Sequence, residues 1–179
     1  MKSFFICLWS VLFVILLTFI INCFEGYLYP IKYSEEIKKY SEQNLISASL
    51  VASVINVESA YKKDCVSSKG AKGLMQIMPE TAKWIAEKRE MEFVEDKLFD
   101  IEYNIDFGCY YLSYLMRYFE DEDLAICSYN AGMGNVSKWL KDESLSENGK
   151  LVKIPFEETN TYLNKVKKNI RHYKNKYQI

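Results

Sequence analysis

The sequence predicts an all-α domain that follows one apolar, membrane-spanning helix. No stretch of the 179 residues alternates apolar and polar side chains for long, and runs of β-branched residues are short. Apolar residues instead recur at helical spacing, in segments bounded by capping residues and Pro. The third observation is an uncharged, strongly apolar run from Ser3 to Phe24. We therefore expect helices joined by short loops, with room only for a small hairpin around 142–154.

The apolar run is the first element. A helix needs about 20 apolar residues to cross a bilayer, and the run Ser3–Phe24 is long enough to do so. A cleaved signal peptide is the alternative, but it has a shorter apolar region and a small-x-small cleavage site, which is missing here. We expect residues 1–26 to be an uncleaved anchor in the cell membrane. Lys2 before the run and Glu25 after it favour a cytoplasmic N-terminus, so that the rest of the chain lies on the extracytoplasmic side.

The remaining residues, 27–179, are predicted to form one domain. Capping residues and helix-initiating Pro mark the predicted helix starts. We expect helices over 31–43, from the cap Asn44 to about Val57, from Pro79 to about Lys88, from the cap Asp100 to Phe119, from Asp123 to Asn130, over 135–141 and over 158–177. The helix that ends at Phe119 carries an aromatic stripe at helical spacing, which we interpret as core: Tyr103, Phe107, Tyr110, Tyr111, Tyr114 and Tyr118.

Charge and cysteine usage exclude several classes of protein. Lys and Arg number 23 against 24 Asp and Glu, so the basic excess of a nucleic-acid-binding protein is missing. Two of the five cysteines lie in the apolar run, and Cys65, Cys109 and Cys127 form no CxxC pair, which argues against a zinc site and a disulfide framework. The sequence does not decide whether Cys109 and Cys127 form a disulfide. His172, the only His, is interpreted as a surface residue, and no metal or cofactor is implied.

One carboxyl stands out for its position. Glu58 follows Leu50, Val51 and Val54 by eight, seven and four residues, so all four share one helix face. A carboxyl at the end of a buried stripe is partly desolvated, which raises its pKa. General-acid catalysis of glycoside cleavage needs such a protonated carboxyl. On position alone the alternative is a solvated Glu at a helix end, since most Glu side chains are exposed.

Four motifs surround this residue. They are Glu58-Ser59, then Gly73-Leu74-Met75-Gln76-Ile77-Met78-Pro79, then Tyr129-Asn130-Ala131-Gly132, and finally Pro155 with Glu158-Thr159 and Tyr162. In content and order they resemble the lytic transglycosylase domain of the soluble type, which is related in fold to goose-type lysozyme. The resemblance runs from about residue 35 to the C-terminus. It departs from the family at Cys127 and Ser128, where two Ala are frequent, and at Met133, where Pro is common.

The resemblance implies a lysozyme-like fold and an enzyme that acts on peptidoglycan glycan strands. The family cleaves the β-1,4 bond between N-acetylmuramic acid and N-acetylglucosamine with one catalytic Glu, which falls on Glu58. Residues that line or brace the glycan groove fall on Ser67, Met75, Gln76, Met78, Tyr129, Asn130, Glu158 and Tyr162.

Side-chain chemistry suits these roles. Met75 and Met78 offer soft apolar surface to a sugar, although we expect one of them mainly to pack. Gln76 offers a donor and an acceptor. In the family arrangement the Tyr129 hydroxyl bonds Glu58, and Gly132 suits a left-handed helix cap.

The expected reaction product follows from the carboxylates near Glu58. The ranges 65–79 and 124–136 contain no Asp or Glu. Asp64 is expected to lie in a solvated turn, and the resemblance assigns Glu158 to substrate binding. With no base positioned for water, the 6-hydroxyl of the sugar is the available nucleophile, so a 1,6-anhydro product is expected. Two alternatives remain, a lysozyme-type hydrolase and a non-catalytic peptidoglycan-binding or assembly protein. The sequence points to no partners beyond glycan strands and the membrane.

Overall fold

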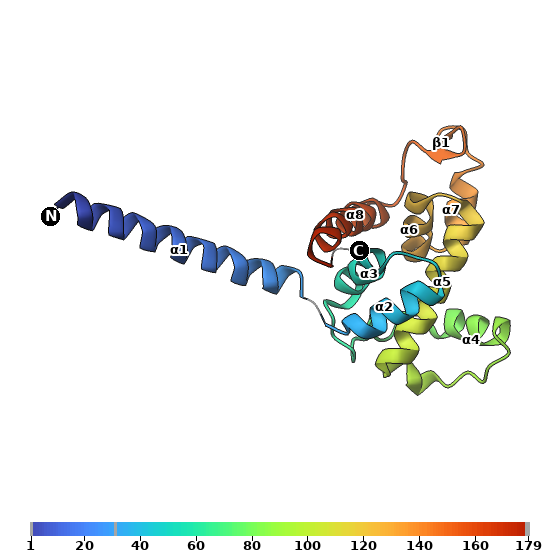
Figure 1. The fold of residues 1–179 in the computed structure, drawn as a ribbon. Helices are drawn as coiled ribbons and strands as arrows, with labels where there is room; N and C mark the ends of the chain where they lie inside the picture. Colours follow the sequence, from blue (N-terminus) through green and yellow to red (C-terminus); the bar gives the residue numbers. More distant parts are fainter. Residues whose placement is uncertain (1, 31, 178–179) are drawn as a thin grey trace. The chain divides into compact units, whose positions relative to one another are not determined.

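The protein is described by a computed structural model, which covers residues 2–30 and 32–177 (Figure 1). It falls into two compact units that divide after residue 31. The first unit consists of α1 (Lys2–Leu28). Its stretch Trp9–Leu28 is long and apolar enough to cross a membrane, and its large apolar side chains are exposed. The predicted N-terminal apolar helix is therefore present.

The second unit is helical, as predicted, and it carries one small hairpin inside the range 142–154. Figure 1 shows its order along the chain. The elements are α2 (Ser34–Gln43), α3 (Ala48–Ser59), α4 (Pro79–Lys88), the 3-10 helix η1 (Glu95–Phe99), α5 (Ile101–Phe119), α6 (Glu122–Ala131), α7 (Met133–Trp139), β1 (Ser146–Glu147), β2 (Lys150–Leu151) and α8 (Glu157–Tyr177). The two strands pair antiparallel.

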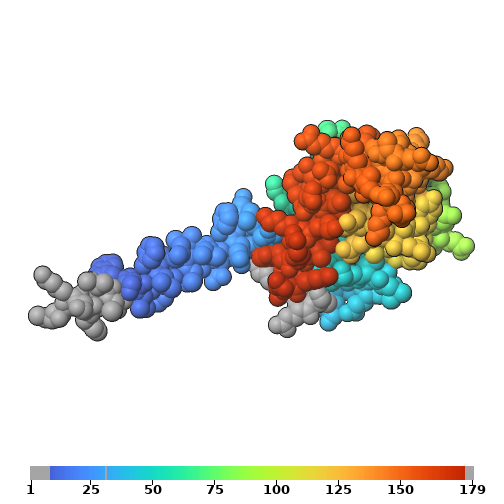
Figure 2. Space-filling model, turned by 90° about the horizontal axis from the view of Figure 1, so that it is seen from above, coloured from blue at the N-terminus to red at the C-terminus, as the bar shows by residue number. Residues whose placement is uncertain are grey.

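The core surrounds α3, which packs between α2 and α8 (Figure 1). Leu50, Val51, Val54 and Ile55 of this helix are all buried, which is why its sequence is apolar on nearly every side. In Figure 2, α8 and the hairpin, orange to red, form much of the visible face of the domain. The outward side of α8 is accordingly polar, while Val166 and Ile170 face the core.

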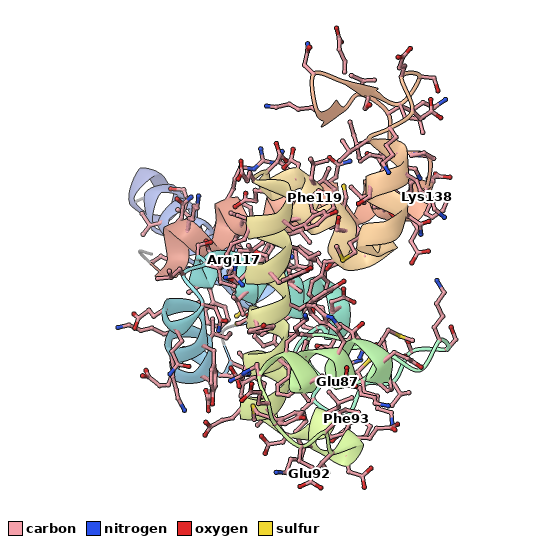
Figure 3. The ribbon with its side chains drawn as sticks, turned by 90° about the vertical axis from the view of Figure 1, so that its right-hand side faces the viewer. Glu87, Glu92, Phe93, Arg117, Phe119 and Lys138 are labelled. Atoms are coloured by element: carbon pink, nitrogen blue, oxygen red, sulfur yellow. The ribbon has the colours of Figure 1, made fainter. Side chains whose placement is uncertain are left out.

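The second centre of packing is α5, which contacts α2, α4, η1 and α6. Figure 3 shows it running between α4, which carries Glu87, and α7, which carries Lys138, with Phe119 at its end. The predicted aromatic core stripe is wrong for most of its members. Phe107 is fully buried, but Tyr110, Tyr111 and the other tyrosines are half-buried or exposed, because small and aliphatic residues fill the inner face: Asn104, Ile105, Gly108, Cys109, Leu112, Ser113 and Leu115.

The bounds of α4 and α5 agree with the sequence, and other helix ends differ by up to a few residues: α2 begins at Ser34 rather than at residue 31, which lies outside the described residues, and α7 spans Met133–Trp139 rather than 135–141. Asp100 caps α5 as predicted, with its side chain accepting from the Tyr103 backbone N–H. The cap of α3 is Ser47 rather than Asn44, which ends α2 instead, and α6 begins at Glu122, after the cap Asp121, rather than at Asp123. In each case a nearer capping side chain reaches the N–H three residues later. Gly132 ends α6 with positive φ, but its ψ of 139° lies outside the left-handed helical region.

Candidate active site

The last turn of α3 opens into a cleft. Glu58 stands there, half-buried, just beyond the buried stripe that begins at Leu50. Two adjoining hollows, of about 440 and 460 Å³, share Glu58, Asn130 and Glu158 in their walls. Each is in the size range of a small-molecule site. Glu58 therefore lies where the two hollows meet, at the middle of one cleft.

The pKa of the Glu58 carboxyl is raised to about 7. Burial is the main cause, because it disfavours the charged form. The nearby Tyr162 hydroxyl lowers the pKa, because it stabilises the charged form, and the negative charge of Glu158 raises it further. At neutral pH a large share of Glu58 is consequently protonated and able to donate.

Two tyrosines flank Glu58, in roles that differ from the expected ones. The Tyr129 hydroxyl donates to the Met75 carbonyl oxygen at 2.8 Å rather than to Glu58. Tyr162 is the hydroxyl that acts on the Glu58 carboxyl, but it forms no hydrogen bond of regular geometry with any described residue. Burial raises the pKa of both tyrosines well above its usual value. Both hydroxyls thus stay neutral, and that of Tyr162 is buried beside the second hollow.

One wall of the cleft is the apolar segment 72–78, which is held by side chains from three helices. Ser59 of α3 donates to the Leu74 carbonyl oxygen at 2.8 Å. Asn104 of α5 accepts from the Met75 N–H at 2.7 Å and donates to the Lys72 carbonyl oxygen at 3.0 Å. Tyr129 of α6 completes the set with its bond to Met75. The segment can be apolar because its backbone polar groups are satisfied from outside.

The backbone of this segment is specialised. Gly73 has φ of 79°, and a Cβ there would overlap the Asn104 side chain and the Leu98 carbonyl oxygen. Gln76 is also in the left-handed region, with φ of 49°. Its side-chain nitrogen donates to the carbonyl oxygens of Cys65 at 3.0 Å and Gly73 at 2.8 Å, which offsets the cost of that conformation.

The expected groove residues divide into two groups. Ser67, Gln76, Met78, Tyr129, Asn130 and Glu158 line the first hollow, and Asn130, Glu158 and Tyr162 line the second. Met75 does neither, because its side chain is fully buried and fits against Gly108, where a Cβ would overlap it. Met75 is therefore the packing member of the pair, and the half-buried Met78 is the one that lines the cleft.

Several lining residues have partners that limit what they can offer a ligand. The Ser67 hydroxyl accepts from the Ala71 N–H at 2.9 Å. The Gln76 nitrogen is used within the loop, so its carbonyl oxygen is the part left for a ligand. Asn130 accepts from the buried Thr159 hydroxyl at 2.7 Å, which ties α6 to the start of α8. Glu158, next to this tie, is exposed.

Sequence reasoning missed Asn104, which lines neither hollow but fixes the wall. Its signal was a lone amide among the apolar residues of the inner face of α5. It also missed Thr81 and Tyr111 as lining residues. Tyr111 had been assigned to the core, and nothing in the local pattern separates a half-buried ring from a buried one.

The described cysteines are free, and Cys109 and Cys127 are buried thiols rather than a disulfide. Burial raises the pKa of Cys127 to about 12, so it stays protonated. His172 is half-buried rather than a surface residue and meets the Tyr173 ring edge-on. Within residues 9–30 and 32–175, no group of three or more His, Cys, Asp or Glu could hold a metal ion.

Comparison with known proteins places this cleft in a family. Residues 35–152 match the family model described as "Transglycosylase SLT domain". The chain is 32% identical over 143 residues to the soluble lytic murein transglycosylase of Escherichia coli K12, covering 77% of this chain and 22% of that protein. It is 30% identical over 140 residues to the membrane-bound lytic murein transglycosylase C of Edwardsiella ictaluri, covering 69% of this chain and 36% of that one.

A solved structure agrees with the fold. The lytic transglycosylase Slt of Pseudomonas aeruginosa, solved as an inactive Glu-to-Gln mutant, superposes with a TM-score of 0.79 at 29% identity. The match covers 86% of this chain and 26% of that one, and the chain spans about a quarter of the length of the soluble relatives it matches. The family match extends over most of the helical unit and includes the turn of α3 with Glu58 and the segment 72–78. The chain therefore belongs to the transglycosylase SLT domain family.

Proposed function

We propose that the protein is a peptidoglycan lytic transglycosylase that cleaves the β-1,4 bond between N-acetylmuramic acid and N-acetylglucosamine. The observation that carries this proposal is the Glu58 carboxyl, with a pKa of about 7, at the middle of an open cleft. A group with that pKa is half protonated at neutral pH, as a general acid should be. The names of the related proteins support the same activity.

The proposed reaction uses Glu58 twice. The protonated carboxyl gives its proton to the glycosidic oxygen while the bond from that oxygen to the anomeric carbon breaks. The resulting carboxylate takes the proton from the 6-hydroxyl of the muramic acid, whose oxygen bonds to the anomeric carbon. The reaction consumes no water, leaves a 1,6-anhydro ring and returns Glu58 to its protonated state. An intramolecular attack of this kind gains from proximity, by roughly 7–11 kcal/mol in well-oriented cases.

We propose that the remaining groove residues hold the glycan. Met78 offers its thioether to a sugar face, and the Gln76 carbonyl oxygen accepts from an acetamido or hydroxyl group. Asn130, fixed by Thr159, presents its NH₂ group, and Ser67 braces the loop opposite. Tyr162 orients the Glu58 carboxyl.

One observation favours hydrolysis as the alternative. Glu158 lines both hollows and acts electrostatically on Glu58, so a second carboxylate does lie near the acid. Two-carboxylate glycosidases hold such a group about 5–9.5 Å from the acid, as nucleophile or as base for water. The Glu158 side chain is exposed, however, and no described residue holds it in the position of a base for water. We therefore assign it to substrate binding.

We further propose that α1 anchors the protein in the cell membrane, with the helical unit on the extracytoplasmic side, where peptidoglycan lies. The stretch Trp9–Leu28 supports an anchor by its length and composition. Lys2 and Glu25 support the orientation. One of the related proteins is named as membrane-bound.

The deciding experiment is product analysis. The full chain, in detergent micelles, is incubated with purified peptidoglycan, and the soluble products are weighed by mass spectrometry. We expect muropeptides that are lighter by one water than their hydrolytic counterparts. Reducing-end products alone would support the hydrolase, and no products would support a non-catalytic binding protein.

The Glu58→Gln variant is the companion test. Gln cannot protonate the leaving oxygen, and loss of general-acid catalysis costs roughly 10²–10⁴-fold in rate. Glu87→Gln, on the exposed side of α4 (Figure 3), is the matched control and should keep full activity. If Glu58→Gln kept more than a few per cent of the rate, another residue would have to be the acid.

A further inference from the structure

The outward face of α8 carries a dense positive charge. From Thr159 onward the chain has six of its 23 Lys and Arg and none of its 24 Asp and Glu. Four of these cations are exposed on one face of the helix, at spacings of three and four residues: Lys167, Lys168, Arg171 and Lys174. Figure 2 shows α8, in red, along the surface of the helical unit. We call these four residues the basic face of α8.

Little within the chain neutralises the basic face. Lys167 pairs with Asp123 of α6 at 2.6 Å, but both side chains are nearly half exposed, so that the pair contributes little. Among the residues that the structure describes, no carboxylate pairs with Lys168, Arg171 or Lys174. Three cations of the basic face are therefore open to a partner from outside the chain.

Helix stability does not explain this arrangement. Like charges three or four residues apart repel one another and destabilise a helix. The helix macrodipole favours cations only in the last turn, which accounts for Lys174 in a helix that ends at Tyr177. It does not account for Lys168 and Arg171, which lie further in. A basic amphipathic helix of this kind is typical of a surface that meets a membrane or another polyanion.

The membrane is the polyanion that the proposed anchor keeps close. Five residues, 29–33, lie between the end of α1 at Leu28 and the start of α2 at Ser34. A stretch of that length spans at most about 18 Å, so the helical unit stays near the bilayer that holds α1. A tethered surface acts at a high effective concentration, whereas a dissolved polyanion must be captured from solution.

We propose that the basic face of α8 docks on the anionic lipid headgroups of the membrane that holds α1. The proposal rests on the proposed anchor and is independent of the proposed reaction. Lys and Arg donate charge-assisted hydrogen bonds to headgroup phosphates. Glu158 and Tyr162, in the first turns of the same helix, line the cleft. Docking of α8 therefore fixes the direction in which the cleft opens relative to the bilayer.

The test compares the full chain in two kinds of lipid nanodisc, one of phosphatidylcholine alone and one that also contains phosphatidylglycerol. Exposed lysines are acylated with a water-soluble reagent, and mass spectrometry gives the labelling rate of each. Docking should slow the labelling of Lys168 and Lys174 by roughly fivefold or more in the anionic nanodiscs. The exposed Lys83 and Lys88 of α4 should be labelled equally in both. In 1 M salt the Debye length falls to about 3 Å, so the protection should be lost.

A double variant, Arg171→Gln with Lys174→Gln, keeps Lys168 as the reporter. Each lost cation should weaken docking by roughly fivefold, so Lys168 should be labelled in anionic nanodiscs nearly as fast as in neutral ones. The matched control, Lys83→Gln with Lys88→Gln, removes the same charge from α4 and should leave Lys168 protected. The melting temperature of each double variant reports its fold.

Equal labelling of Lys168 in the two kinds of nanodisc would overturn the proposal, and so would equal effects of the two double variants. Protection by sodium polyphosphate in neutral nanodiscs, without protection by anionic lipid, would identify a dissolved polyanion as the partner instead. A chain that does not remain with the nanodiscs refutes the anchor and the docking with it. A chain that remains but is unprotected refutes the docking alone. Because turnover is not measured, an inactive enzyme would refute the proposed reaction and leave the docking standing.

Discussion

At the scale of single residues, the proposed reaction depends on how neighbouring groups set the pKa of Glu58. Burial and the charge of Glu158 raise it, and the hydroxyl of Tyr162 lowers it. The acid must be protonated to act, so activity should be lost as pH rises through about 7. Initial rates of anhydro-muropeptide release between pH 5 and 9 measure this limb. A rate that stayed flat to pH 9 would show that Glu58 does not titrate in the reaction.

The Glu158→Gln variant tests the cause of the shift. It removes a neighbouring negative charge, so the pKa of Glu58 should fall and the falling limb should move to lower pH. Tyr162→Phe removes the hydroxyl that stabilises the carboxylate form, so the pKa of Glu58 should rise and the limb should move to higher pH. Opposite shifts separate these effects from a general loss of structure, which would lower the rate at every pH.

At the scale of elements, the wall segment 72–78 depends on close backbone contact at Gly73. A Cβ at this position would overlap Asn104 and the Leu98 carbonyl oxygen, and φ is positive. Gly73→Ala should therefore lower the free energy of unfolding by roughly 1–3 kcal/mol from overpacking, beyond the cost of the positive φ. It should also lower activity, because the wall lines the cleft.

Gly149→Ala is the matched control, since Gly149 has φ of 75° but nothing within 4 Å of its Cβ position. It carries the conformational cost without the overlap. Chemical denaturation of both variants gives the difference. Equal losses for the two would mean that the close approach of Asn104 does not matter.

What the sequence could predict at this scale depended on whether the information was local. The cap Asp100, the helix-initiating Pro79, the apolar run of α1 and the face shared by Glu58 and Val54 are local patterns, and each has its counterpart in the structure. The burial of Met75 depends on a helix distant in sequence, and so does the fact that Tyr162, rather than Tyr129, acts on the Glu58 carboxyl. Likewise the pattern of α5 placed Tyr111 on a stripe, but only packing against α4 decides that it borders the cleft.

At the scale of the whole molecule, we expect the proposed anchor to hold the proposed enzyme at the membrane. Membrane fractionation should find the full chain with the membranes, because Trp9–Leu28 can cross a bilayer as a helix. Protease added outside protoplasts should remove the helical unit, since the proposal puts it on the extracytoplasmic side. A shortened, soluble form that begins near residue 27 would instead indicate a cleaved signal.

The three helices that hold segment 72–78 do so across very different lengths of chain. The bonds from Ser59, Asn104 and Tyr129 join residues 15, 29 and 54 positions apart. We expect contacts over such separations to form late in folding, because the entropy of the intervening loop must be lost before the contact can stabilise the chain. A chain whose helices have formed but have not yet docked has the acid on α3 but no wall opposite it. We therefore expect the proposed transglycosylase activity to appear only when the helices have docked, so that a partly folded chain is inactive.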